Sequence, residues 1–444
     1  MELEGRKALV VGLGKSGLAS AELLVKHGTI VRAIDLDAPG PETARRLEQL
    51  RVPFVRQSPE EFLQCDLIVL SPGVPAHLAP LDEARARGVD VIGEVELAAA
   101  FLKGPIIGIT GSNGKTTTTA LVGHILREAG VPVQVGGNIG TAVTAMIDGS
   151  RDAQWNVLEL SSFQLETIRE FRAHIGAALN VTPDHLDRHG TFAAYADAKG
   201  RLFENQKPDD FAVLNAEDAA CVAYAAHTRA RPVWFSSRRA VNPGVWLEEG
   251  TIRFNGETLM PAAEIPIRGM HNVENMMAAA AAAHLAGVGL KAIASAVKTF
   301  RAVEHRLEFV RTLDGVDFYN DSKATNVDAT LKALDAFAGG LWVILGGKDK
   351  GSDYTVLRAP LAAKARAALL IGAAAAKIGE QIQGAVPLVD AKTLDAAVRE
   401  AYAAARPGET VLLAPACASF DQFQNYEHRG RVFKTLVQEL ESKN

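Results

Sequence analysis

Short apolar runs alternate with longer amphipathic stretches from the start of the chain. In the first region, runs at 8–11, 30–34 and 67–70 predict strands, and the stretch after the first run has the apolar spacing of a helix. A short strand followed by an amphipathic helix is predicted for 88–101. Strands joined by helical crossovers are typical of a mostly parallel sheet. The pattern predicts an α/β fold, and we place the end of this region at residue 94.

The same alternation continues through two further regions. The second contains apolar runs at 106–109, 133–135, 155–160 and 177–181, and the third contains runs at 316–320, 341–345, 368–372 and 410–413. A chain of 444 residues is too long for a single hydrophobic core. We therefore predict three domains: an N-terminal Rossmann-like domain at 1–94, a central domain with a mostly parallel sheet at 95–302, and a C-terminal Rossmann-like domain at 303–444.

The first predicted strand runs into a glycine turn. Gly12, Gly14 and Gly17 form a G-x-G-x-x-G pattern, and Asp35 follows the next strand. Glycines allow backbone N–H groups to approach a pyrophosphate, and an acid at this distance is placed to bind a ribose hydroxyl. The arrangement predicts a nucleotide diphosphate site and does not say which nucleotide binds there. An NAD-dependent oxidoreductase is one alternative that this turn leaves open.

A second glycine turn gives the strongest functional signal. Residues 105–119 read PIIGITGSNGKTTTT, in which an apolar strand is followed by two glycines, Lys115 and four threonines that open a helix. Such a loop holds phosphates through its N–H groups, the helix N-terminus and the lysine, and the Thr116 hydroxyl is placed to hold magnesium. The spacing is shorter than that of a strict Walker A loop. The central domain is therefore predicted to be of the P-loop ATPase type.

Polar residues gather just after the strands that follow this loop. Glu159 lies at the end of one predicted strand, and an acid beside a phosphate loop is where ATP-bound magnesium is usually held. The next strand is followed by DHLDRH at 184–189, which is rich in metal-ligand residue types. Neither an H-E-x-x-H helix nor a nearby cysteine supports zinc, so we predict a hard cation held by oxygen and one imidazole. A surface position is the alternative for His189.

Two helices of the central region carry further polar candidates. By sequence alone, Lys199 is a solvated lysine of the helix predicted at 192–203. Asn272 and Asn275 lie on one face of an alanine-rich helix, where they are candidates to recognise an adenine edge. Helix capping by Asn272 is the alternative.

The third region adds polar loops at the ends of its predicted strands. DSKATN at 321–326 and PACASFDQF at 415–423 each gather charged and hydroxyl groups where open α/β sheets bind ligands. Another strand is followed by Gly346-Gly347-Lys348. No histidine or helix start is placed to lower the pKa of Cys417, so we predict a small buried thiol there.

The overall composition limits the classes of partner. With 48% hydrophobic and 22% charged residues, the chain resembles an ordinary soluble protein. A net charge of −5 gives no electrostatic basis for binding nucleic acid or an anionic membrane. Three scattered cysteines suit a reducing compartment, and the sequence shows neither a signal peptide nor a membrane-spanning stretch. We therefore expect a cytoplasmic protein that binds neither nucleic acid nor membrane. A monomer is a separate expectation, because composition does not determine the oligomeric state.

Together, these motifs resemble the Mur ligases over essentially the whole chain. ITGSNGKTT and the His-Arg pair at 305–306 are shared with the wider group of Mur and folylpolyglutamate ligases, whereas ELSSFQLE, NDSKATN and PACASFDQF resemble the branch that adds D-glutamate to UDP-N-acetylmuramoyl-L-alanine (UDP-MurNAc-L-Ala). The resemblance implies an ATP-dependent amide ligase of peptidoglycan precursor synthesis, which forms an acyl phosphate and releases ADP and phosphate. Its substrates would be ATP, UDP-MurNAc-L-Ala and D-glutamate, and its cofactor two Mg²⁺ ions.

The resemblance also implies roles for residues at matching positions. The implied catalytic groups are Lys115, His185, Lys199 and Lys323. The implied ATP contacts are Gly111, Asn113, Gly114, Lys115, Thr116, Thr117, Asn275, Arg306 and Asp321. The implied UDP-substrate contacts are Ser16, Gly17, Asp35, Gly73, Asn138 and Ser161, and the D-glutamate contacts are Thr325, Lys348, Ser419 and Phe423. The implied magnesium ligands are Thr116, Glu159, His185 and Lys199, the last as a carbamate.

Three alternatives account for fewer of these residues. A different amide ligase or a folylpolyglutamate synthase is disfavoured by the first domain and the third-domain loops. An oxidoreductase leaves Lys115, Glu159 and His185 without a role, and a non-catalytic nucleotide-binding protein does not need so many polar groups at strand ends. If ATP binds the central domain and the amino acid binds the third, residues 302–306 are the expected hinge.

Overall fold

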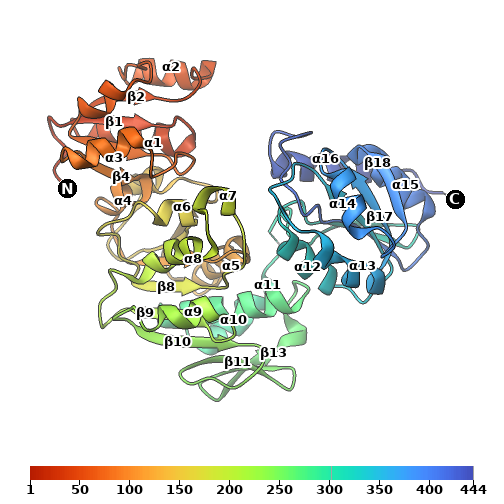
Figure 1. Cartoon of the computed structure of the whole chain (residues 1–444). Helices are drawn as coiled ribbons and strands as arrows, with labels where there is room; N and C mark the ends of the chain where they lie inside the picture. The colour runs from red at the N-terminus through yellow and green to blue at the C-terminus, as the bar shows by residue number, and fades with distance from the viewer. Residues whose placement is uncertain (302, 444) are drawn as a thin grey trace. The chain divides into compact units, whose positions relative to one another are not determined.

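The computed structural model describes residues 1–301 and 303–443, which form three sheets with flanking helices (Figure 1). Most neighbouring strands run parallel, so the predicted α/β class is confirmed. Ala302, at the predicted domain boundary and hinge, lies outside the described residues. Contacts divide the chain into two compact units. The first comprises Met1–Val181, Arg188–Met260 and Met276–Ala296, and the second comprises Thr182–Asp187, Pro261–Asn275 and the described residues from Val297 onward.

The first sheet has the strand order β2-β1-β3-β4, with all neighbours parallel. Its strands are β1 (Lys7–Val11), β2 (Ile30–Ile34), β3 (Leu67–Leu70) and β4 (Asp90–Gly93). Its helices are α1 (Lys15–Lys26), α2 (Pro41–Gln49), α3 (Ala79–Ala86) and α4 (Glu94–Ala99). Every residue of β3 is buried, as expected of a parallel strand covered on both faces.

The second sheet has the order β13-β12-β11-β10-β9-β8-β5-β7-β6. Its strands are β5 (Ile106–Thr110), β6 (Val133–Gly137), β7 (Trp155–Glu159), β8 (Ile175–Ala178), β9 (Phe211–Asn215), β10 (Arg231–Ser236), β11 (Gly244–Glu248), β12 (Thr251–Phe254) and β13 (Glu257–Pro261). The strand predicted at 177–181 lies earlier, because Ile175 and Gly176 pair with β5 while the chain leaves the sheet after Ala178. Polar residues after that point are therefore loop residues at the sheet's carboxyl edge.

Helices accompany the second sheet along the chain. They are α5 (Lys115–Glu128), α6 (Ser162–Leu165), α7 (Leu186–His189), α8 (Phe192–Gly200), α9 (Ala219–Tyr224), α10 (Met270–Leu285) and α11 (Leu290–Thr299). Each alanine at 278–283 in α10 is completely buried, so this part of the helix belongs to the core. No helix in the described part of the chain is long and apolar enough to cross a membrane.

The third sheet has the order β14-β15-β19-β16-β17-β18. Its strands are β14 (Glu308–Leu313), β15 (Val316–Asn320), β16 (Leu341–Gly346), β17 (Ala365–Ile371), β18 (Leu388–Lys392) and β19 (Thr410–Leu413), and its helices are α12 (Val327–Asp335), α13 (Arg358–Lys364), α14 (Ala375–Ile382), α15 (Leu394–Ala404) and α16 (Tyr426–Glu439). Among the described residues of this sheet, β14 pairs with β15 in antiparallel fashion, and the other strand pairs are parallel. Because β19 lies between β15 and β16, the polar loops that follow these three strands meet at one edge.

Candidate active site

The phosphate-loop sequence forms the predicted strand, turn and helix. Gly114 precedes α5 with a φ of 86°, a left-handed conformation that glycine adopts without strain. The Lys115 Nζ donates hydrogen bonds to the carbonyl oxygens of Gly111 and Ser112, at 2.7 and 2.9 Å. The lysine therefore folds back over the loop, and its charge adds to the partial positive charge of the α5 N-terminus.

Asn180 fixes the shape of this loop. Its Oδ1 accepts a hydrogen bond from the Asn113 N–H at 2.9 Å, and its Nδ2 donates to the Asn113 carbonyl at 3.1 Å. The Asn180 carbonyl also accepts the Ser112 N–H at 2.8 Å. Asn180 is thus a positioning residue for the phosphate loop, which the sequence analysis did not single out.

Glu159, the last residue of β7, forms the polar centre of the first unit. Its Oε2 accepts a hydrogen bond from the Thr116 Oγ1 at 2.8 Å, and its Oε1 accepts one from the Asn138 Nδ2 at 2.9 Å. The residue is only 1% exposed. At Gly137, a Cβ would lie 2.3 Å from the Glu159 carbonyl oxygen, so β6 needs glycine to approach this closely. A hydroxyl and a carboxylate side by side are hard oxygen donors, which suit Mg²⁺.

Lys199 is not the solvated helix lysine that spacing predicts. Its exposure is 1%, and its Nζ donates to the Gly111 carbonyl at 2.8 Å. The same Nζ lies 4.5 Å from the centre of the Tyr195 ring, and the Tyr195 hydroxyl is 3.1 Å from the Ser112 Oγ. That prediction is wrong because α8 packs its Tyr195 and Lys199 face inward, onto the phosphate loop. The fold thus places a buried amine next to the phosphate loop.

His185 belongs to the short segment Thr182–Asp187 of the second unit. It has a φ of 53°, which is uncommon for a residue with a side chain, and it is half-buried. Its N–H donates to the Asp184 Oδ1 at 3.0 Å, and its Nε2 lies 3.7 Å from Asp184. The Asp184 Oδ2 also accepts a hydrogen bond from the Asn326 Nδ2 at 3.0 Å, and the Lys350 Nζ lies 3.8 Å away. Sequence reasoning assigned no role to Lys350.

His189 is buried, so the surface alternative for it is wrong. Its side chain is 3% exposed, its Nδ1 lies 3.0 Å from Glu166, and its Nε2 lies 3.0 Å from the Ser162 Oγ. The neighbouring Arg188 lies over the Phe163 ring and donates to the carbonyl oxygens of residues 72, 73 and 74 at 3.4, 3.1 and 2.7 Å. Arg188 thus ties the Ser-Pro-Gly loop of the first sheet to the central sheet.

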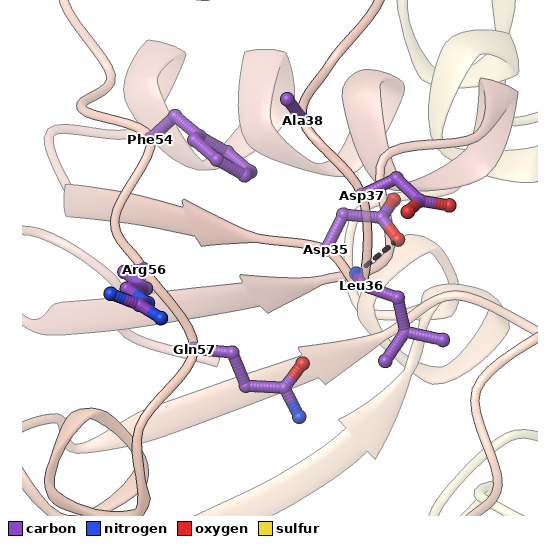
Figure 2. A pocket seen from close by; sticks show the side chains of 7 residues that line it. All are labelled: Asp35, Leu36, Asp37, Ala38, Phe54, Arg56 and Gln57. Carbon is purple, nitrogen blue, oxygen red and sulfur yellow. Dashed lines mark hydrogen bonds between the residues drawn. The ribbon is translucent and has the colours of Figure 1, made fainter.

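A pocket of about 470 Å³ lies at the carboxyl end of β2. Figure 2 shows segments 35–38 and 54–57 facing each other across it. The Asp35 Oδ2 accepts the Leu13 N–H at 2.6 Å and its Oδ1 accepts the Leu36 N–H at 2.7 Å, which fixes the carboxylate against the glycine turn. The pocket is lined by Asp35, Leu36, Asp37, Ala38, Phe54, Arg56 and Gln57.

The other candidate UDP-substrate residues lie on the glycine turn and on the central sheet. A Cβ at Gly17 would lie 1.8 Å from the Gly12 carbonyl, so the turn can only close with glycine there. The Ser16 carbonyl accepts the Ser20 hydroxyl, and the Gly73 carbonyl accepts Arg188. Ser161 caps α6 in a capping box with Gln164.

The second unit brings Asp321, Arg306 and Lys323 together. Asp321, directly after β15, is 4% exposed, and burial raises its pKa to about 6 although the charges of Arg306 and Lys323 lower it. Its Oδ1 accepts the Leu307 N–H at 3.3 Å. The Arg306 Nε is buried and has no hydrogen-bond partner among the described residues. A buried guanidinium N–H of this kind fits an anionic ligand such as a nucleotide phosphate.

The two asparagines of α10 contact each other. The Asn275 Nδ2 donates to the Asn272 Oδ1 at 3.1 Å, and the Asn272 Nδ2 donates to the Arg268 carbonyl at 2.6 Å. Asn272 lies inside α10, which begins at Met270, and its side-chain oxygen accepts from the Asn275 side chain, so the capping alternative is wrong. Beside them, burial lowers the pKa of His271 to about 4, which leaves a neutral imidazole at pH 7.

The third-sheet loops hold the remaining candidates. Ser419 is buried, and Phe423 packs edge-on against His428 at 5.7 Å. Lys348 pairs with Ala418 through its backbone, while its side chain is exposed. Thr325 donates its N–H to the Lys323 carbonyl at 2.8 Å. Cys417 is a buried thiol with a pKa raised to about 11 by burial, as predicted.

Family models match most of the chain. Residues 6–93 match the Mur ligase MurD-like N-terminal domain, residues 109–283 the Mur ligase middle domain, and residues 305–417 the Mur ligase glutamate ligase domain. The UDP-N-acetylmuramoylalanine--D-glutamate ligase of Solibacter usitatus is 69% identical over 448 residues, which covers 100% of both chains. The chain belongs to the Mur ligase family. The Acidobacterium capsulatum protein of the same name is 54% identical and covers 98% of this chain and 97% of its own.

Solved structures of other Mur ligases and a related enzyme share the fold. A pseudomurein peptide ligase type C from Methanothermus fervidus has a TM-score of 0.63 at 17% identity, covering 98% of this chain and 100% of its own. UDP-N-acetylmuramate-alanine ligase MurC from Thermotoga maritima has a TM-score of 0.61 at 19% identity, covering 98% and 99%. At this identity the likeness extends to the architecture alone. The Mur ligase fold is thus found here by sequence and by structure.

The buried carboxyl of this Mur ligase predicts a pH-dependent stability. Because the folded-state pKa of Asp321 is raised, its ionisation opposes folding as pH rises from 4 to 6. Asp321→Asn keeps an acceptor for Leu307 and removes that charge. We expect its unfolding free energy to match the wild type near pH 4 and to exceed it on the order of 2 kcal/mol at pH 7.5. Urea denaturation at both pH values measures this.

The control is Asp390→Asn, which removes an exposed carboxylate from β18 of the same sheet. Its stability relative to the wild type should not change with pH. An Asp321→Asn protein no more stable than the wild type at pH 7.5 contradicts the prediction.

Proposed function

We propose that this Mur ligase joins D-glutamate to UDP-MurNAc-L-Ala with ATP, releasing ADP and phosphate, as a step of peptidoglycan precursor synthesis. The observation that carries the proposal is the Thr116–Glu159 pair beside a phosphate loop, in a chain that is 69% identical over its full length to a relative of that name. The alanyl carboxylate of UDP-MurNAc-L-Ala is a poor acyl donor. One of its oxygens therefore first attacks the γ-phosphorus of ATP, which forms an acyl phosphate and releases ADP. The amine of D-glutamate then attacks the acyl carbon, and phosphate leaves from the tetrahedral intermediate.

ATP would bind at the phosphate loop. The N–H groups of the loop and α5 and the Lys115 ammonium would hold its phosphates, with contacts from Gly111, Asn113, Gly114, Lys115, Thr116 and Thr117. The adjacent oxygens of Thr116 and Glu159 fit Mg²⁺, which when bound would neutralise phosphate charge. We assign a second ion to His185 and to Lys199 as a carbamate, since carbamylation converts an amine into oxygen ligands.

The second unit would supply the remaining groups for ATP. The Arg306 Nε, buried without a partner in the described residues, supports a phosphate contact, and Asp321 and Asn275 would bind the nucleoside. Lys323 would offset charge on the transferring phosphoryl group. D-glutamate, which carries two carboxylates, would bind to the loops after β15, β16 and β19, through Thr325, Lys348, Ser419 and Phe423.

The UDP end of the nucleotide sugar would lie at the first sheet. Asp35 would take a ribose hydroxyl, with Ser16, Gly17 and Gly73 against the diphosphate and Asn138 and Ser161 toward the sugar. The pocket in Figure 2 supports this, because the apolar side chains of Leu36 and Phe54 are 87% and 37% exposed at its rim. Exposed apolar side chains in front of a pocket suit a flat base.

The assay for this function is phosphate release from ATP by the purified full chain. We expect release that requires UDP-MurNAc-L-Ala and D-glutamate together, because each half-reaction needs its own acceptor. Omission of either substrate is the control. Release with another amino acid and not with D-glutamate would overturn the assignment of the amino acid.

Phe54→Ala tests the base pocket. Loss of an aromatic ring that stacks on a base weakens the binding free energy by on the order of 1–3 kcal/mol. We therefore expect the KM for UDP-MurNAc-L-Ala to rise about tenfold with kcat unchanged. Ile30→Ala, which truncates an exposed apolar residue at the opposite end of β2, is the matched control. An unchanged KM in Phe54→Ala contradicts the assignment.

Lys199→Ala tests the carbamate. We expect kcat to fall at least about a hundredfold, because removal of one group that stabilises transition-state charge typically lowers kcat by on the order of a hundredfold or more. A short carboxylic acid such as acetate, added at millimolar concentration, should restore part of the activity by supplying the missing oxygens. Lys207→Ala, at an exposed lysine of the same unit, should be neither impaired nor rescued. Full activity of Lys199→Ala without added acid rules the carbamate out.

A further inference from the structure

The largest completely buried side chain in the described residues is a guanidinium. Arg429 lies on α16 and is 0% exposed. Its Nε donates to the Ser322 Oγ at 3.0 Å and one Nη to the Ser322 carbonyl at 2.8 Å. Both Nη atoms lie 3.2 Å from the Cys417 carbonyl, and one lies 3.5 Å from the Ala418 carbonyl. Its fork therefore joins two loops that are almost a hundred residues apart in sequence.

All of these acceptors are neutral. Burial lowers the pKa of Arg429 to about 10, so that it stays charged at pH 7, while the charge of Asp421 raises that pKa in part. Within the described residues, Arg429 and Asp421 do not form an ion pair. Burying a charge without a counter-ion opposes folding. The neutral acceptors satisfy the hydrogen bonds of the Arg429 guanidinium, but they do not explain why a charged group is kept at this position.

The two loops that Arg429 joins follow neighbouring strands. Ser322 comes just after β15, and Cys417 and Ala418 come just after β19. A third loop packs on the same group, since a Cβ at Gly347 would lie 2.2 Å from the Ala418 carbonyl and 3.2 Å from an Arg429 Nη. These loops carry Lys323, Thr325, Lys348 and Ser419. One buried cation thus underlies every loop assigned above to D-glutamate.

We propose that Arg429 is a positioning residue for the acidic amino-acid substrate. It holds the loops after β15, β16 and β19 in register, and its buried charge adds positive potential that favours an amino acid with two carboxylates. Substrate carboxylates would then add to the negative charge that Asp421 already supplies from beyond ion-pair distance. The proposal rests on the proposed function, because it assumes that the substrate of these loops is D-glutamate.

The test compares Arg429→Met and Arg429→Lys in the full chain, with phosphate release measured against each substrate in turn. We expect Arg429→Met to raise the KM for D-glutamate at least about tenfold, within the hundredfold that an ångström of misplacement can cost. The KM for ATP should rise less than the KM for D-glutamate. Thr325, Lys348, Ser419 and Phe423 all lie on the loops that Arg429 joins, whereas Asp321 alone among the residues assigned to ATP flanks Ser322. Arg429→Lys, which keeps the charge and loses the fork, should fall between the wild type and Arg429→Met.

Arg431→Met is the matched control, since it removes an exposed guanidinium two residues further along α16. It should leave all three KM values unchanged. A folded Arg429→Met with an unchanged KM for D-glutamate, or with all three KM values raised equally, overturns the proposal. If both Arg429 variants fail to fold by circular dichroism, Ser322→Ala decides. It removes the acceptor of the Nε, together with the donor to the Tyr426 carbonyl, and leaves the guanidinium in place. A rise of about threefold or more in the KM for D-glutamate then supports the proposal, and a smaller change overturns it. A wild type that does not use D-glutamate refutes the proposed function instead.

Discussion

The hydrogen bond between Thr116 and Glu159 holds the phosphate loop and the acid at the end of β7 together, and the function proposed above depends on it. It joins the first turn of α5 to the end of β7, so the phosphate loop and the acid are held together before any ligand binds. The bond forms because β5 and β7 are neighbouring parallel strands, whose carboxyl ends lie at the same edge. Asn138 directly follows β6, which lies on the other side of β7, and its Nδ2 donates a second hydrogen bond to Glu159. Hydrogen bonds from residues that follow β5 and β6 thus fix the position of the Glu159 carboxylate at the end of β7.

Several charged groups in this chain are buried at a cost to stability. Lys199, Asp321 and Arg429 are at most 4% exposed, and the pKa values of Asp321 and Arg429 move toward their neutral forms. A protein selected only for stability would replace such groups by apolar residues of similar volume. Asp321 directly follows β15, and Lys199 and Arg429, which lie on helices, contact loops at strand ends. The functions proposed above give the alternative explanation: the three groups would be placed for charged substrates, and binding would supply part of the stabilisation.

The sequence predicted the features that depend on local pattern. β2, β3, β15 and β19 have the predicted bounds because each is a short apolar run, and the phosphate loop is set by its glycines and lysine. Features that depend on packing were not predictable. Lys199 and His189 lie on helical stretches with no strong apolar face, so their burial follows from tertiary contacts with the phosphate loop and with Glu166. β14 was missed because its half-exposed, mixed sequence has no apolar run. The domain boundaries and the site assignments stay predictions.

The contrast between Glu159 and Arg429 shows why a motif identifies one class of site residue and not the other. Glu159 is the last residue of β7, which neighbours the strand that leads into the phosphate loop, so its position in the sequence indicates the role proposed for it. Arg429 lies on a helix after the last loop, between a histidine and a glycine, and nothing in its neighbours distinguishes it from the exposed Arg431. What distinguishes it is its set of acceptors, the carbonyl oxygens of two distant loops. Such a residue becomes visible only when the fold has brought those loops together.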